Sequence, residues 1–408
     1  MDEPSVPLPG RRGAAAWWLV LVSVLALVVT GTVVGLHVVL PPAASQPAPA
    51  PVAPASSPPS SRDPAPTPST PAEPGAPVVV AAGAGPLLPG VGAGVVYAQA
   101  ATAIFRVELA TGRVTRTPTP DLEEHVTFLA GAGWVLVKSR WSPTGVLVRD
   151  GHPAAALPEL FDAEGLVHAG PSGRLWLQPE PSTDPRATTT LRLAGLDGRL
   201  VAGEELVAPG SAAPYVLVPD GYGTVLMANR RGVHRLVAGP SGGRRQGRLV
   251  ARGTFIAAGG HRVLVRDCGS GQHCPTVLVD ERTGHRTERP AAGRTLRAGG
   301  GAGTDPDAYG DAALSPDGTH LAVTASDEAG VLRAHVVDLR SGRETVLPGE
   351  GTDANANRQL AWSPNSRWLL ALTDGRLRAY DTRRGTSRSV ALGGERLLHL
   401  TTVHHPGW

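Results

Sequence analysis

The sequence predicts an all-β fold, a seven-bladed β-propeller at residues 78–408, preceded by one transmembrane helix and a disordered linker. A turn pattern that recurs at nearly constant spacing predicts the propeller, with six or eight blades as the alternatives. Short apolar runs between the turns fit strands, and no apolar stripe with helical periodicity accompanies them. One long uncharged apolar stretch near the N-terminus predicts the helix.

The composition is that of a mostly folded chain. Its 51 Gly and 39 Pro are many, but fewer than a wholly disordered chain of 408 residues would carry. A hydrophobic fraction of 41% allows a sizeable core. The 38 Lys and Arg against 35 Asp and Glu leave a net charge of +3, too small for a protein that binds nucleic acid by counterion release. We therefore expect no nucleic-acid partner.

Residues 14–40 carry no charged side chain and are long enough to span a bilayer with some tilt. Arg11 and Arg12 precede this stretch, and the next basic residue after it is Arg62. The positive-inside rule then predicts a cytoplasmic tail at 1–13 and a propeller outside the cytoplasm. The localisation that follows is the cell membrane, with a single pass.

A cleaved signal peptide is the alternative to an uncut anchor, because the small residues at 43–45 could be a cleavage site. The apolar region of a signal peptide is only about 7–15 residues, however, which favours the anchor. Within the span, Gly31 and Gly35 have the small-xxx-small spacing that would allow weak self-association of two helices. Chance spacing of common glycines explains the same pair.

Residues 41–77 form the linker. They are mostly Pro, Ala, Ser and Thr and carry few charges. Such a segment cannot bury enough apolar surface to offset the entropy of ordering it. Proline favours extended polyproline II conformations, so the linker would hold the propeller away from the membrane.

The repeat consists of an apolar run, an acidic residue, three further residues and a glycine. We find it at residues 104–112, 277–284, 336–342 and 377–385, with a degenerate copy at 193–198. The acidic side chain at the strand end would cap a turn, and glycine would adopt the positive φ that closes it. Each copy therefore predicts a hairpin.

The spacing of these glycines gives the number of repeats. Gly112, Gly198 and Gly284 are 86 residues apart, which is two steps of 43, and weaker apolar runs at 146–150 and 233–237 fill the gaps. Gly342 and Gly385 are again 43 apart. The distance from Gly284 to Gly342 is longer, and the additional residues lie in a Gly-rich stretch at 298–311. Seven repeats result, with periods typical of propeller blades.

The last two repeats carry a more specific signature. Residues 314–322, Leu-Ser-Pro-Asp-Gly-Thr-His-Leu-Ala, and residues 362–370, Trp-Ser-Pro-Asn-Ser-Arg-Trp-Leu-Leu, resemble the repeat of the TolB-type, WD40-like propeller family. The resemblance implies a radial propeller with a binding funnel that usually serves protein contacts, and it transfers no catalytic residue. We also expect residues 396–403 to form a strand that completes the first blade, begun by 78–97, because such pairing removes exposed sheet edges.

Cys268 and Cys274 are the only cysteines and lie in a Gly-rich segment between two apolar runs. Outside the membrane, such a pair predicts a disulfide. A metal site that uses His273 is the alternative, but two cysteines and one histidine make an incomplete zinc set.

Four other patterns have both a chemical and a structural interpretation. Residues 239–243 match a nucleophile elbow, but no helical pattern follows, which favours a hairpin loop. His404 and His405 could bind a metal or simply end the chain. Asp305, Asp307 and Asp311 are spaced loosely like calcium ligands, without a full ligand series. Trp134, Trp141 and Trp176 fit core packing better than a ligand stack. We assign no catalytic, cofactor or metal residue.

The function we expect is protein binding, as a scaffold or accessory component of an envelope complex. The insertion at 291–311 is the predicted partner surface, because loops on a rigid scaffold carry specificity. An extracytoplasmic hydrolase or lyase with a funnel active site is the alternative, and a passive spacer is a third reading.

Overall fold

The computed structural model describes most of the chain after residue 74. The described residues are 75–122, 126–139, 145–159, 161, 166–178, 189–208, 216–219, 225–229, 232–236, 247–268, 274–290, 312–326, 332–349 and 360–403. The predicted membrane helix at 14–40 and nearly all of the predicted linker lie outside them. Within the described ranges, no helix is both long and apolar enough to cross a membrane.

The strands form seven antiparallel sheets. In order from one edge to the other, the first contains β1 (Val78–Ala81), β4 (Val114–Pro118), β3 (Ala103–Glu108), β2 (Val95–Ala100) and β29 (Leu397–Thr402). The second contains β5 (Val126–Gly131), β6 (Trp134–Ser139), β7 (Gly145–Arg149) and β8 (Ala155–Ala156). The third contains β9 (Leu166–Ala169), β10 (Leu175–Gln178), β11 (Thr189–Ala194) and β12 (Leu200–Ala208), with the short 3-10 helix η1 (Pro171–Gly173) between its first two strands.

The remaining four sheets are plain meanders. The fourth sheet contains β13 (Val216–Pro219), β14 (Val225–Asn229), β15 (Gly232–Arg235) and β16 (Arg248–Ala251), and the fifth contains β17 (Thr254–Gly259), β18 (Arg262–Arg266), β19 (Thr276–Asp280) and β20 (Arg286–Arg289). The sixth contains β21 (Ala312–Leu314), β22 (His320–Ser326), β23 (Leu332–Asp338) and β24 (Glu344–Val346). The seventh contains β25 (Leu360–Trp362), β26 (Trp368–Thr373), β27 (Arg376–Asp381) and β28 (Thr386–Val390).

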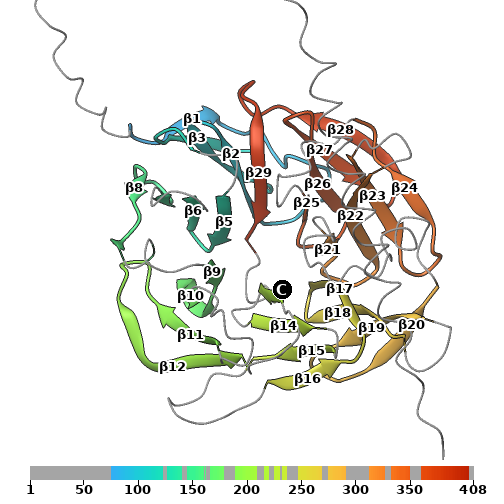
Figure 1. Cartoon of the computed structure of the whole chain (residues 1–408). Helices are drawn as coiled ribbons and strands as arrows, with labels where there is room; N and C mark the ends of the chain where they lie inside the picture. Colours follow the sequence, from blue (N-terminus) through green and yellow to red (C-terminus); the bar gives the residue numbers. More distant parts are fainter. Residues whose placement is uncertain are drawn as a thin grey trace, which may run out of the picture. The chain divides into compact units, whose positions relative to one another are not determined.

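The seven sheets are the blades of a propeller. Figure 1 shows them arranged around a central axis, with the first strand of each blade nearest to it. Neighbouring blades contact one another in a closed cycle, mostly through these strands: β29 contacts β5, β5 contacts β9, and the series returns through β21 and β25 to β29. The prediction of seven blades, rather than six or eight, is confirmed.

The ring closes in the first blade, as predicted. β29, the last strand of the chain, pairs with β2, so that Ala98 lies opposite Leu400 and Gln99 opposite His399. Figure 1 shows the red β29 beside the blue β2. The structure adds one strand to the prediction, because β1 pairs with β4 and makes the first blade five-stranded.

The predicted repeat is the turn between the third and fourth strands of a blade. After β3, β19, β23 and β27, the N–H of the glycine donates a 2.8 Å hydrogen bond to the carbonyl oxygen of the acidic residue. These glycines, Gly112, Gly284, Gly342 and Gly385, have φ between 67° and 71°, a conformation that glycine adopts without steric cost. The predicted weaker runs at 146–150 and 233–237 lie on β7 and β15, the third strands of their blades.

The core lies between the blades. The described residues form seven buried apolar clusters, each shared by the facing sheets of two neighbouring blades. Trp134 and Trp176 are 3% and 2% exposed and belong to two of these clusters. Their interpretation as core residues is confirmed, whereas Trp141 lies outside the described residues.

Candidate functional surface

The propeller has two faces, which the strand order determines. Because neighbouring strands are antiparallel, the turns from first to second strand and from third to fourth strand lie at the same end of each blade. We call this end the turn face; it includes residues 109–113, 315–319 and 363–367. The connections from second to third strand and from blade to blade lie at the other end, which we call the loop face.

The lengths of the connections vary more on the loop face than on the turn face. On the turn face the connections are short, apart from residues 82–94 between β1 and β2 and residues 236–247 in the fourth blade. On the loop face they range from the tight turn at 101–102 to the connections 179–188, 347–359 and 290–311. Repeat proteins vary their insertions on one face, and that face often binds partners. The loop face is therefore the candidate functional surface.

The turn face is built from side-chain caps. Oγ of Ser315 donates to the carboxylate of Asp317 (2.8 Å) and accepts the N–H of His320 (2.9 Å). In the next blade, Oγ of Ser363 makes the equivalent two bonds: it donates to Oδ1 of Asn365 and accepts from the N–H of Trp368. The turns in the two signature segments, 314–322 and 362–370, are therefore closed by the same pattern of hydrogen bonds.

These turns also join blades to one another. Nη1 of Arg262, in the fifth blade, donates to the carbonyl oxygen of Pro316 in the sixth (2.8 Å). The N–H of Asp317 donates to Oγ of Ser366 in the seventh (2.9 Å). The turn face is consequently a series of interblade contacts, which explains why its turns are short.

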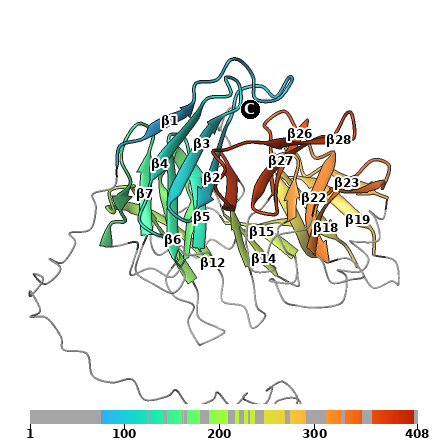
Figure 2. The same cartoon turned by 90° about the horizontal axis from the view of Figure 1, so that it is seen from above.

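The segment between β1 and β2 adds contacts between the seventh blade and the first on the turn face. Residues 82–94, which we call the strap, connect β1 to β2 along the turn face, and Figure 2 shows the strap reaching toward the seventh blade. Nδ2 of Asn365 donates to the carbonyl oxygen of Gly90 (2.6 Å), and Nε1 of Trp368 donates to that of Pro89 (3.1 Å). The strap thus reinforces the closure made by β29.

The carboxylates of the turns are committed to internal contacts. Burial would raise the pKa of Asp317, but hydrogen bonds from Thr319, Ser315 and Ser366 keep it below its usual range. Burial would likewise raise the pKa of Asp381, but the hydrogen bonds and charge of Arg367, together with backbone hydrogen bonds from Arg383 and Arg384, lower it below its usual value. These carboxylates are caps and ion-pair partners, not groups poised for proton transfer.

One further polar cluster lies between the first and second blades. The hydroxyl of Tyr97 donates to Oδ1 of Asp150 (2.7 Å), and Nε of Arg106 lies 2.8 Å from the other carboxylate oxygen. Burial, followed by the hydrogen bond to Asp150, raises the pKa of Tyr97 well above its usual value. The phenol therefore stays protonated and links two blades.

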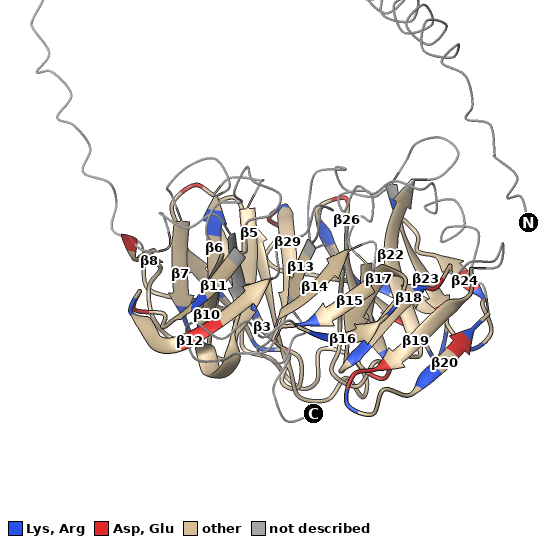
Figure 3. Cartoon of the chain, turned by 60° about the horizontal axis from the view of Figure 1, so that its bottom comes forward, with Lys and Arg blue, Asp and Glu red and all other residues tan. Residues whose placement is uncertain are grey.

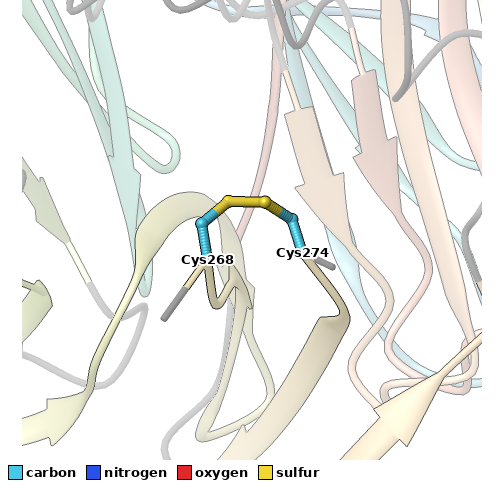
Figure 4. The surroundings of a disulfide bond; sticks show 2 residues. All are labelled: Cys268 and Cys274. Atoms are coloured by element: carbon cyan, nitrogen blue, oxygen red, sulfur yellow. A yellow bond between two sulfur atoms is a disulfide. The ribbon is translucent and has the colours of Figure 1, made fainter. Parts of the chain in front are cut away.

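The predicted disulfide is confirmed and lies on the loop face. Cys268 and Cys274 are bonded, with their Cα atoms 4.1 Å apart, and Figure 4 shows the bond spanning the connection between β18 and β19. The N–H of Asp267 donates to the carbonyl oxygen of Pro275 at the base of this connection (3.0 Å). Arg286 also pairs with Asp267 (2.6 Å). The base of the disulfide loop is therefore fixed to the blade.

The other candidate residues of the sequence lie outside the described residues. They are His273, the elbow-like segment 239–243, the three aspartates at 305, 307 and 311, and His404 and His405. The insertion at 291–311 lies outside as well; the end of β20 and the start of β21, which flank it in the chain, lie on the loop face.

The described part of the chain offers no metal site. Within the described ranges, no group of three or more His, Cys, Asp or Glu lies close enough together to hold a metal ion. In the view of Figure 3, both basic and acidic residues occur over strands and turns.

Comparison with known proteins gives similarity at the level of structure alone. No family model matches the chain, and no curated protein matches it. A protein of Bacteroides fragilis, provisionally assigned as a 6-phosphogluconolactonase, is 14% identical with a TM-score of 0.44, covering 76% of this chain and 98% of its own. TolB of Acinetobacter baumannii is 9% identical with a TM-score of 0.39 (76% and 66% covered), and an oligogalacturonate lyase of Vibrio parahaemolyticus is 10% identical with a TM-score of 0.41 (66% and 80% covered). These values carry no conclusion about activity.

Proposed function

We propose that this chain is a non-catalytic, membrane-anchored propeller that binds a protein partner outside the cytoplasm, as a scaffold or accessory component of an envelope complex. Residues 14–40 would be its single anchor, with the N-terminus in the cytoplasm, and residues 41–77 its spacer. The loop face would be the partner surface, and the insertion at 291–311 would be its main contact segment.

The observation that carries the proposal is the difference between the two faces. The turn face uses its side chains to join blades, as the bond between Asp317 and Ser366 illustrates. The loop face carries the long and unequal connections, together with the one disulfide of the described chain. A rigid ring with one variable face is a suitable scaffold for specific contacts.

A cross-linking pulldown of the tagged full-length chain from its native membrane tests the proposal. We expect one reproducible envelope protein, which is lost when residues 291–311 are replaced by a short Gly-Ser loop. The matched control changes the opposite face, with Arg340→Ser and Arg343→Ser in the exposed turn after β23, and should retain the partner. If no protein is captured above background, or if both variants lose it equally, the proposed binding face is wrong. A screen of the purified protein against small molecules would then test the hydrolase or lyase alternative.

The anchor is tested separately by extraction of membranes with alkaline carbonate. An anchored chain stays in the membrane pellet, whereas a chain whose N-terminal segment has been cleaved is released. The intact mass of the recovered protein shows directly whether residues 1–45 are still present.

A further inference from the structure

The first blade carries an outer strand that differs from those of the other blades. Apart from the two-residue β8, β1 is the only strand of the described chain in which every residue is exposed, and Val78, Val79 and Val80 are 56%, 44% and 44% exposed. It pairs with β4 on one side, and no described strand covers its other edge. A row of unpaired backbone N–H and C=O groups beside exposed valines is a template for pairing with another strand.

The outermost strands of the other blades are protected. Apart from the two-residue β8, each of them carries at least one charged side chain, which discourages edge-to-edge pairing. The charged residues are Glu204 and Glu205 on β12, Arg248 on β16, Arg286, Glu288 and Arg289 on β20, Glu344 on β24, and Arg388 on β28. β1, Val-Val-Val-Ala, has none.

The composition of β1 suits a second copy of itself. Two β1 strands related by a two-fold axis would pair antiparallel, and every cross-strand pair would consist of Val and Ala side chains without any like-charge contact. The pairing with β4 is regular at Val78 and Val79 and shifts between Val79 and Ala81, so Val79 lies in the regular part of the strand.

The edge of β1 is too small to support a stable dimer of free chains. Stable interfaces between independent proteins bury on the order of 1,200–2,000 Å², far more than two four-residue strands can supply. Chains anchored in one membrane meet at a much higher effective concentration. The linker leads directly into β1, and the Gly31–Gly35 spacing would bring two anchors close together. A second copy is the one partner that always carries this anchor.

We infer that β1 is a self-association edge, which pairs antiparallel with β1 of a second copy anchored in the same membrane. This inference rests on the proposed anchor but not on the proposed partner face, since it uses the outer edge of the first blade. The carbonate extraction described above distinguishes a failed anchor from a failed edge.

Single-cysteine cross-linking of the full-length chain in its native membrane tests the inference. The two natural cysteines are bonded to each other, so Val79→Cys adds the only free thiol. Under mild oxidation we expect a species of twice the chain mass that reverts with reductant. Val346→Cys is the matched control, because Val346 is also exposed (49%) on an outermost strand, β24, and it should give at least roughly tenfold less dimer.

A second variant tests the strand pairing itself, read out through the same thiol. Adding Val78→Lys and Val80→Lys to the Val79→Cys chain places like charges opposite one another and should reduce the dimer roughly tenfold. Three results would overturn the inference: no dimer from Val79→Cys in carbonate-resistant membranes, an equal dimer from Val346→Cys, or a cross-linked species whose mass shows a different protein at the edge.

Discussion

The N–H of Asp317 in the sixth blade donates a 2.9 Å hydrogen bond to Oγ of Ser366 in the seventh. Both residues belong to turns between a first and a second strand, and each turn is closed by its own serine, Ser315 or Ser363. The same short turn motif therefore fixes the geometry within a blade and the packing between blades. The turn face is in this respect part of the scaffold.

The first prediction concerns this interblade bond. Ser366→Ala removes the acceptor of the Asp317 N–H, and we expect a loss of about 1 kcal/mol in the free energy of unfolding. Ser341→Ala is the control, because the side chain of Ser341 bonds only within its own turn, to the N–H of Arg343 (3.3 Å) and the carboxylate of Asp338, and its cost should stay within about 0.5 kcal/mol. Urea unfolding of the two variants measures the difference. Equal losses would show that the interblade bond contributes nothing.

The second prediction concerns the close approach of the fifth and sixth blades. Gly260 has φ of +58°, and a Cβ atom added to it would overlap the carbonyl oxygen of Pro316. Gly284 has a similar φ of +71°, but a Cβ atom there would meet no atom within 4 Å. Both Ala variants incur the strain of a left-handed conformation, about 1–2 kcal/mol, and only Gly260→Ala must also separate two blades. We expect Gly260→Ala to be clearly less stable in thermal unfolding, and equal melting temperatures would contradict the tight junction.

The third prediction is a pH dependence caused by His320. Burial lowers the pKa of this histidine, although Asp338 and Asp317 act to raise it, and Arg340 adds to the lowering. The unfolded chain then binds a proton at a higher pH than the folded chain, so the stability contribution is complete above about pH 6.5 and is lost as the pH falls toward the lowered pKa. His320→Gln should flatten the fall in unfolding free energy between about pH 7.5 and about pH 5.5. An unchanged slope in the His320→Gln variant would contradict the prediction.

The sequence predicts the repeated part of this fold because the repeat is local chemistry. An aspartate at a strand end and a glycine four residues later suffice to form a capped turn, and Asp280, Asp338 and Asp381 each accept two backbone N–H bonds as expected. The cysteine pair was equally predictable, since the chain has only two. Closure by β29 followed from the need to cover two sheet edges.

The contacts that join distant residues were not predictable in the same way. Asn365 and Gly90 are far apart in the chain, and their bond uses a backbone carbonyl that any residue would supply. The placement of β1 as a fifth, outermost strand likewise depends on where the strap crosses the ring. Apolar patterning identifies 78–81 as a strand but does not reveal its neighbour. The membrane anchor and the insertion at 291–311 stay predictions.

The fourth prediction concerns the disulfide. Replacing Cys268 and Cys274 together by Ser should cost only about 2 kcal/mol, because the bond closes a short loop. In urea unfolding without reductant, the double variant should be less stable than the wild-type chain by this amount. With reductant, which breaks the disulfide of the wild-type chain, the two chains should be equally stable. Labelling of intact cells with a membrane-impermeant thiol reagent provides the related test of topology. Labelling only after reduction agrees with a bonded pair outside the cytoplasm, whereas labelling without reduction would contradict the bond.

The last prediction concerns ring closure by β29. Removing residues 397–408 deletes β29 and exposes the edge of β2, which pairs with it along the whole strand. It also removes Leu397 and Leu400 from the cluster that joins the seventh and first blades, and each buried leucine lost costs about 2–5 kcal/mol. Removing only 404–408 is the matched control, since it leaves β29 in place. We expect the longer truncation to aggregate or to be digested rapidly by trypsin, while the shorter one resists as the full chain does. Equal resistance of both truncations would show that the strap, through Asn365 and Trp368, is sufficient to hold the ring closed without β29.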